Sequence, residues 1–282
     1  MDYFEIIVFL AAILLTGVFF IRWYRFTLSG ILMRRNVFSR TALCLLPVIS
    51  FTIIMYTLTA LASFDVVDSG FWIFFYVLIG FSWLYFGMFL MFTFFDLSWI
   101  DDALNSNNPA AALAVVGGGL GVTLIYAGSN IGDGPGWWCV FFACGLGVVS
   151  WVILGALINS ITKIFRRITV GRDIFCGIRT SSYLLSSGLI LGRASAGDWT
   201  SFSKTVEEFG DGWPVLILAA GFILAELFFV TTEKQETEKQ VEQSDKGVKC
   251  FVSLVLGIVY IVVAIYTLRI LPPLPVNPIY SR

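Results

Sequence analysis

The sequence predicts an all-α fold, a polytopic transmembrane helical bundle of about eight spans built from repeated two-helix hairpins. Hydrophobic residues make up 58% of the 282 residues and charged residues only 13%, whereas a soluble domain carries about 25% charged residues. Apolar segments of about 20 residues, the length that crosses a bilayer as a helix, recur along the chain. Helix is required because backbone groups in hydrocarbon must bond within their own segment.

Short polar connections separate the apolar segments. We interpret the chain as a single membrane domain, 1–282, that contains an N-terminal hairpin (1–69), two hairpin repeats (70–135 and 136–211) and a degenerate third repeat (212–282). The expected spans are about residues 3–21, 42–62, 71–95, 110–128, 137–160, 174–192, 213–231 and 249–271.

Two recurring patterns support the hairpin repeat. Three spans begin with an interfacial tryptophan that a glycine follows eight residues later, in the pairs Trp72 and Gly80, Trp137 and Gly145, and Trp213 and Gly221. Because a two-helix unit keeps its orientation from copy to copy, the pattern predicts parallel repeats.

Glycine pairs mark the spans that follow. Asp102 lies fifteen residues before the first glycine of the pair Gly117 and Gly121. Asp173 lies fifteen residues before the first glycine of the pair Gly188 and Gly192. Small residues four apart allow close helix packing in membranes. The glycine-dense stretch 115–121 has a second interpretation, in which the span unwinds and offers backbone groups to a bound ion.

The distribution of Lys and Arg predicts the orientation in the membrane, because cytoplasmic connections are enriched in basic residues. The connections after spans one, five and seven hold thirteen Lys and Arg residues, and the opposite side holds four. Both termini are therefore expected outside the cytoplasm. The acidic connection from Asp96 to Asn108 runs against this assignment.

Two ionisable residues lie inside predicted spans, where charge is costly and usually paired or functional. Arg179 and Glu226 lie at similar depth on antiparallel spans six and seven, which predicts an ion pair. The pair serves either as a structural clamp or as part of a solute path. Ser182, Ser186 and Arg193 continue the polar stripe of span six, which either lines a wet pathway or packs closely against a neighbouring helix.

Composition argues against several other functions. The net charge is −1 and the basic residues are scattered, so nucleic acid is not an expected partner. The chain has no histidine and no paired cysteines in a CxxC spacing, so we expect no metal site, no cofactor and no catalytic residues. The Asp133 loop lacks the intramembrane G-x-G-D motif of an aspartyl protease and is interpreted as a turn.

The entry of span four resembles a known repeat. Asn108, Ala110 and Ala111, followed by Gly117 and Gly121, resemble the repeat unit of the YjfL-like inner-membrane family, whose function is unsettled. The resemblance covers spans three to six, about half of the chain. The second copy departs from it, because Arg179 stands where the first copy has Asn108. The resemblance implies a multi-pass protein of the bacterial inner membrane.

Two functions remain open at this stage. The first is a non-enzymatic scaffold or envelope-stress component that binds protein partners or its own copies within the lipid bilayer, and it draws on the family resemblance. The second is a channel or transporter for small solutes or ions, with a path between spans four, six and seven. The small-residue helices favour the first function, and the Arg179–Glu226 pair favours the second.

Overall fold

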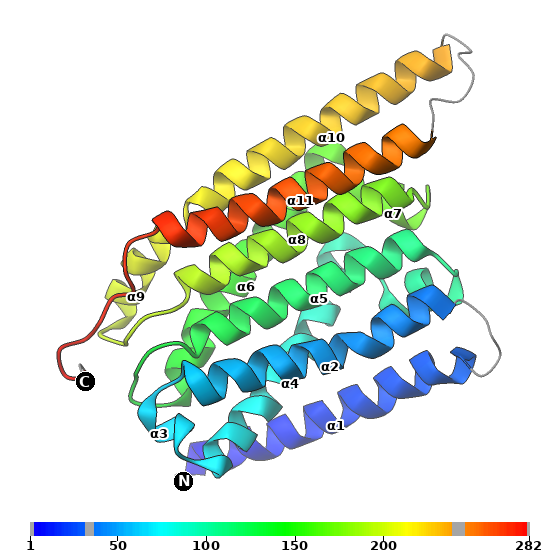
Figure 1. Ribbon diagram of the computed structural model, residues 1–282. Coiled ribbons are helices and arrows are strands. Elements are labelled where there is room, and N and C mark those ends of the chain that lie inside the picture. Colours follow the sequence, from blue (N-terminus) through cyan, green and yellow to red (C-terminus); the bar gives the residue numbers. More distant parts are fainter. Residues whose placement is uncertain (1–2, 32–36, 239–245, 281–282) are drawn as a thin grey trace.

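The computed structural model describes residues 3–31, 37–238 and 246–280. Its long elements are eight apolar helices that can each cross a membrane, which confirms the all-α polytopic fold class (Figure 1). The long helices are α1 (Tyr3–Ile31), α2 (Val37–Ala60), α4 (Gly70–Phe95), α5 (Pro109–Ser129), α6 (Trp137–Thr162), α8 (Ile174–Ala194), α10 (Pro214–Glu238) and α11 (Lys246–Ile270).

Short helices form in several of the connections between the spans, where hydropathy predicted no helix. They are α3 (Phe64–Val67), the π-helix η1 (Trp99–Asn105), α7 (Ile164–Thr169), α9 (Phe202–Phe209) and the 3₁₀ turn η2 (Gly210–Gly212). The first helix is also longer than predicted, because it continues to Ile31 rather than ending near residue 21.

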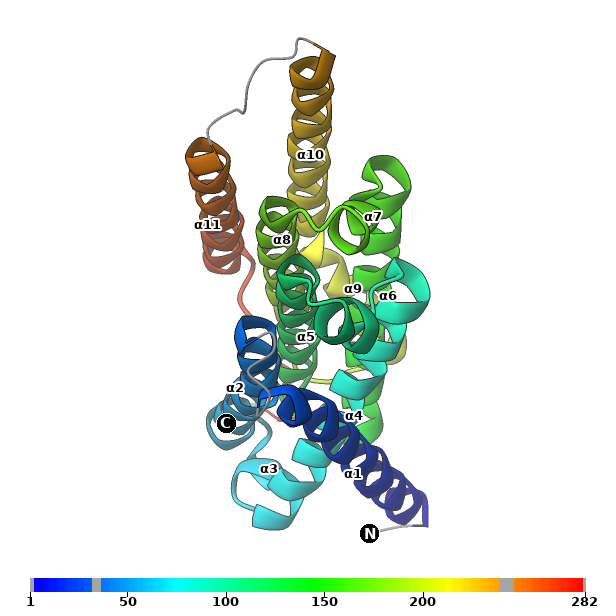
Figure 2. The ribbon, with the colours of Figure 1, turned by 90° about the vertical axis from the view of Figure 1, so that its right-hand side faces the viewer.

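The long helices form two layers (Figures 1 and 2). Helices α2, α5, α8 and α11 lie side by side in one layer, and α1, α4, α6 and α10 form the other. Each successive hairpin contributes one helix to each layer, so the molecule is a row of four hairpins with open ends. In the middle of the row, 78% of an 18-residue apolar stretch of α5 is buried inside the protein. The corresponding shares are 17% for α1 and 22% for α11, at the two ends of the row. The outer helices therefore leave most of their apolar surface to lipid.

The two ends of the helices are chemically distinct. Both marked chain ends lie beyond the same ends of the helices, where α1 begins and α11 ends, and we call this side of the molecule the terminal end (Figure 1). The opposite end carries η1 and α7 and is called the α7 end below. This arrangement follows from an even number of crossings. The connection 239–245, which contributed to the orientation argument, lies outside the described residues.

Helices α5 and α8 touch through their backbones. A Cβ atom added at Gly121 would lie 2.5 Å from the carbonyl oxygen of Leu184. Added Cβ atoms at Gly117, Gly188 and Gly192 would likewise collide with backbone atoms of the partner helix. All four glycines of the two predicted pairs therefore lie in one α5–α8 contact.

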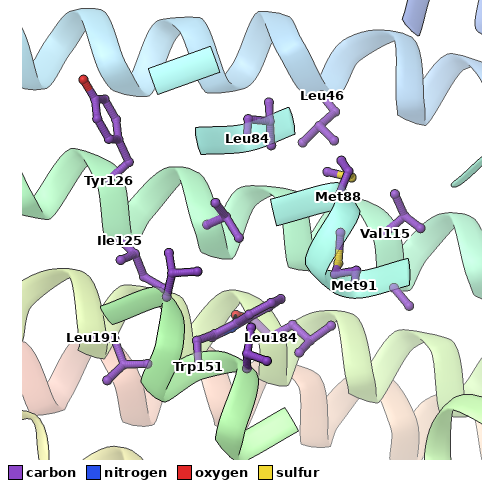
Figure 3. Close-up of a cluster of buried hydrophobic side chains, with 14 of the residues drawn as sticks. Leu46, Leu84, Met88, Met91, Val115, Ile125, Tyr126, Trp151, Leu184 and Leu191 are labelled. Carbon is purple, nitrogen blue, oxygen red and sulfur yellow. Dashed lines mark hydrogen bonds between the residues drawn. The ribbon is translucent and has the colours of Figure 1, made fainter. Parts of the chain in front are cut away.

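Other glycines of α5 accommodate side chains from two further helices. Met91 of α4 occupies the space beside Gly118, while Met88 of α4 and Leu46 of α2 occupy the space beside Gly119. Figure 3 shows these methionines and Leu46 in the buried cluster around α5. Since α5 is continuous from Pro109 to Ser129, the interpretation that this span unwinds at its glycines is wrong. The glycines serve packing on three sides.

A proline in α2 explains how α1 is attached. Pro47 lies inside α2 and has no backbone N–H, so the carbonyl of Leu43, four residues earlier, loses its helical partner. The indole nitrogen of Trp23 in α1 donates to that carbonyl at 2.9 Å. The Trp23 ring also lies 4.3 Å from the ring of Trp99 in η1. These contacts join α1, α2 and η1.

The predicted tryptophan–glycine frame is only partly reflected in packing. The three tryptophans lie at or just before the first residues of α4, α6 and α10. A Cβ at Gly80 would lie 2.7 Å from side chains of Ile54 and Tyr126, whereas Gly145 and Gly221 have nothing within 4 Å. The three glycines therefore share a sequence position but not a packing role, and the repeat itself stays a prediction.

The α5–α8 contact predicts opposite effects for two glycine substitutions. We expect Gly121→Ala to destabilise the protein by about 1–3 kcal/mol, because the added methyl group forces two backbones apart. The matched control, Gly145→Ala, faces open space and should be neutral or stabilising by up to about 1 kcal/mol, because alanine favours helix. Thermal unfolding of both purified variants in the same detergent measures the difference. Equal melting temperatures would contradict close α5–α8 packing.

Candidate functional site

The buried carboxylate of Glu226 on α10 lies at the centre of a charge network. Arg179 of α8 donates two hydrogen bonds to it, from Nε to Oε1 at 2.5 Å and from Nη2 to Oε2 at 2.9 Å. Both residues are buried, with 2% of Arg179 and none of Glu226 exposed. The structure thus brings together the two intramembrane charges that the sequence singled out, in the two-pronged geometry that makes arginine–carboxylate bonds strong.

A second arginine, which sequence reasoning missed, also binds Glu226. Arg167 of α7 donates from Nη1 to Oε2 of Glu226 at 2.9 Å and from Nη2 to Oδ2 of Asp173 at 3.1 Å. The other oxygen of Asp173 accepts the backbone N–H groups of Phe175 and Cys176, so this residue caps α8. Two arginines and two carboxylates balance in charge, and the network links α7 and α8 to α10.

The guanidinium of Arg179 also reaches α11. Its Nη1 donates to the hydroxyl of Ser253 at 2.8 Å, and its centre lies 4.1 Å from the ring centroid of Phe229 on α10. Such a cation–π contact is attractive when water is excluded. Helices α10 and α11 make few contacts with each other. Arg179 therefore joins both helices of the last hairpin to α8.

The residues of the family resemblance have a structural role at the start of α5. Asn108 Oδ1 accepts the backbone N–H groups of Ala110 at 3.0 Å and Ala111 at 3.2 Å, which makes it the N-cap. Its Nδ2 donates to the carbonyl oxygen of Ile168 in α7 at 2.7 Å. Both alanines are fully buried. The motif thus fixes α5 against the helix that carries Arg167.

The polar stripe of α8 faces the last hairpin rather than α5. Ser182 packs against Gly257 of α11. Arg193 donates from Nη2 to the carbonyl oxygen of Pro272, beyond the end of α11, at 2.5 Å. Ser186 is 1% exposed, and its hydroxyl has no hydrogen-bond partner in the described part of the chain. The stripe therefore belongs to the interface of α8 with α10 and α11.

Two tyrosines near this interface share the unpaired state of Ser186. The hydroxyls of Tyr183 on α8 and Tyr260 on α11 are buried without a partner among the described residues. Phe222 of α10 connects the two, with its ring centroid 4.5 Å from that of Tyr183 and 5.6 Å from that of Tyr260. Buried polar groups in proteins are normally hydrogen-bonded, often to ordered water. We call the interface that contains Arg179, Glu226, Ser253, Tyr183, Ser186 and Tyr260 the polar seam.

This arrangement can bind and orient charge. The carboxylate and the guanidinium of the network are engaged with each other, which leaves neither positioned as a free base or acid. Across the residues that the structure describes, no three His, Cys, Asp or Glu side chains gather closely enough to hold a metal ion. The α5–α8 contact also leaves no space for a solute between the fourth and sixth spans.

The network predicts unequal effects for its two ends. We expect Glu226→Gln to destabilise the protein by about 3–5 kcal/mol, because it leaves the buried Arg179 without a counter-charge. Arg179→Gln should cost less, because Arg167 still neutralises Glu226. Thermal or denaturant unfolding in detergent measures both effects. Glu207→Gln, which breaks the exposed pair with Lys204, is the control and should change stability by less than about 1 kcal/mol. A larger loss for Arg179→Gln than for Glu226→Gln would contradict the shared carboxylate.

Comparison with known proteins gave no relative from which to transfer a function. A scan against protein-family models found no match, and neither a search of curated proteins nor a search of solved structures found one. Its own features identify the chain as an integral membrane protein with eight long apolar helices in the described ranges, in which two arginines converge on the buried carboxylate of Glu226.

Proposed function

We propose that this protein is a non-enzymatic scaffold of the membrane that holds protein partners, including copies of itself, beside its row of hairpins. The observation that carries the proposal is the closed α5–α8 contact, in which backbone meets backbone along the glycines of both helices. Such a core resists the opening that a transport cycle between these helices requires. It provides a fixed platform for the outer hairpins.

The open ends of the row are the surfaces proposed for partner binding. Each inner hairpin packs against a hairpin on both sides, whereas the first and last hairpins have a neighbour on one side only. In stacked-repeat proteins that work in water, the terminal units cap the stack with a polar outer face. Exposed apolar residues such as Leu14 on α1 and Ile258 on α11 lie on the terminal helices. A transmembrane helix of a partner or a second copy fits this chemistry.

The proposed location is the bacterial inner membrane, with the α7 end in the cytoplasm and both termini outside it. The excess of Lys and Arg in the connections at the α7 end supports this orientation, and the resemblance to the YjfL-like family supports the location and an envelope-stress role. Reporter fusions at Arg282 and within the connection 239–245 test it. A periplasmic reporter should be active only at Arg282, and activity in the connection would reverse the orientation.

The scaffold proposal predicts position-dependent cross-linking in cells. A photo-reactive residue at Leu14 or Ile258 should give a discrete protein adduct in intact membranes, because these positions lie at the ends of the row. Ile153, equally exposed on the inner helix α6, is the matched control and should give lipid adducts only. Adducts are measured on denaturing gels and identified by mass spectrometry. Lipid adducts alone at all three positions would contradict the proposal.

A second candidate function, a conduit for small solutes or ions, is favoured by the unpaired hydroxyls of the polar seam. It places the path between α8, α10 and α11, displaced from the path between spans four, six and seven that the sequence suggested. Water bound to Tyr183, Ser186 and Tyr260 would connect Arg179 toward the terminal end. The discriminating property is whether the seam is wet.

The sign of a stability change distinguishes a wet seam from a dry one. If water binds there, Tyr260→Phe should destabilise the protein by about 1 kcal/mol, because the hydrogen bond between the Tyr260 hydroxyl and the water is lost. In a dry seam the same substitution should be neutral or stabilising, because an unsatisfied hydroxyl is lost. Tyr126→Phe is the control, because the Tyr126 hydroxyl donates to the carbonyl oxygen of Tyr76 at 2.5 Å and its loss must destabilise. A neutral Tyr260→Phe, with unchanged ion flux in Arg179→Ala liposomes, would rule out the conduit.

A further inference from the structure

A polar cavity of about 60 Å³ lies at the terminal end, remote from the charge network. All three hairpin-to-hairpin connections contribute to its walls: the α2–α4 connection with α3, the α5–α6 loop, and the α8–α10 connection with α9. A single water needs roughly 10–15 Å³ of such space, so the cavity holds a group of a few heavy atoms. Because three connections meet around this cavity, its shape depends on the fold and not on a single loop.

Backbone bonds fix the walls of the cavity. Gly197 donates its N–H to the carbonyl oxygen of Ile131 at 2.9 Å, and Trp199 donates to that of Asp133 at 2.8 Å. The carboxylate of Asp198 accepts the N–H of Asp133 at 2.7 Å and, from the C-terminal tail, the N–H of Asn277 at 3.2 Å. The tail thus holds the two loops together, and the cavity exists without rearrangement, which lowers the free-energy cost of binding.

The lining is acidic and contains no basic residue. Four carboxylate residues contribute to it, namely Asp65, Asp133, Asp198 and Glu208, whereas Lys and Arg are absent from the lining. Burial raises the pKa of Glu208, as do its acidic neighbours Glu207 and Asp211, while Lys204 lowers it. A cation entering the cavity would relieve the unfavourable proximity of these negative charges.

Asp133 is the residue that points to a ligand. Only 9% of the residue's surface is exposed, and it lines the cavity. Its backbone N–H and carbonyl are both bonded to the opposite loop. Among the described residues, its carboxylate oxygens accept no hydrogen bond and form no ion pair. The side-chain oxygens of Asp133 are not fully enclosed by protein, and a positive group that entered the cavity would become their partner.

Two aromatic residues contribute to the lining beside the acidic groups. Tyr76 and Trp199 line the cavity with Asp133, and aromatic faces attract alkylammonium groups. The acidic residues do not gather as a three-ligand metal group anywhere in the described ranges. We propose that this cavity binds a small primary ammonium group, with Asp133 as its counter-ion. The group comes either from a free amine or from the headgroup of an aminophospholipid in the adjacent leaflet.

Titration of ethanolamine into the full-length protein tests the proposal. The protein is reconstituted in phosphatidylcholine nanodiscs, which contain no primary amine, and binding is measured by calorimetry at low ionic strength. We expect saturable binding that weakens about tenfold or more in Asp133→Asn, because a buried charge loses its partner. Asp68→Asn, an exposed aspartate at the end of α3 outside the lining, is the matched control and should bind as the unmodified protein does.

Two further arms complete the experiment. Ethylene glycol, the neutral analogue of ethanolamine, should not bind. Nanodiscs that contain phosphatidylethanolamine separate the two sources, because a lower ethanolamine affinity there assigns the site to the lipid headgroup and an unchanged affinity assigns it to free amines. The proposal is overturned if ethanolamine does not bind in phosphatidylcholine, if Asp133→Asn binds equally well while its melting temperature is unchanged, or if ethylene glycol binds as tightly.

Discussion

Direct backbone contact between α5 and α8 is the constraint on which the positions of the other helices depend. Helices approach this closely only where side chains are absent, and Gly117, Gly121, Gly188 and Gly192 provide that surface. The remaining glycines of α5 admit side chains of α2 and α4 from other directions. In a bilayer, where burial of apolar surface gives helices little reason to associate, such van der Waals contact is a main source of attraction. The row of hairpins is built outward from this pair.

The last hairpin adds a polar connection to the close packing of α11 against α8. Gly221 of α10 faces open space, and α10 and α11 make few contacts with each other. Their polar connection to the core is the network in which Glu226 accepts from Arg179 and Arg167, and Arg179 donates to Ser253. Buried ion pairs add little net stability compared with apolar packing, but they penalise every arrangement that leaves one charge unpaired. The network therefore fixes where the hairpin lies more than how strongly it is held.

Hydropathy and spacing anticipated the parts of this structure that depend on local pattern. The spans follow from segment length, and Arg179 with Glu226 follows from equal depth on consecutive antiparallel helices. Arg167 was missed because its position depends on α7, a turn of helix that places a nominally cytoplasmic arginine against a buried carboxylate. A basic residue six positions before a helix-capping aspartate was the available signal, and it is weak.

Other errors arose where neighbours outweighed intrinsic preference. Consecutive glycines weaken an isolated helix by about 1 kcal/mol each, yet α5 stays helical because three neighbouring helices pack into the space that the glycines leave. Conversely, Gly80 and Gly145 occupy matching positions in the sequence, but only Gly80 has a neighbour in contact. The terminal cavity was not foreseen, because it requires loops far apart in the sequence to meet.

We infer that the α5–α8 core is rigid and that Glu226 positions the last hairpin against it. A pair of spin-label distances in lipid nanodiscs tests this most directly, one between positions 89 and 153, in the hairpins that contain α5 and α8, and one between 153 and 224, in the hairpins that the network joins. Phe89, Ile153 and Leu224 are all exposed enough to carry a label. In Glu226→Gln we expect the second distance distribution to broaden or shift while the first stays unchanged. An unchanged second distance, or equal disturbance of both, would contradict the claim.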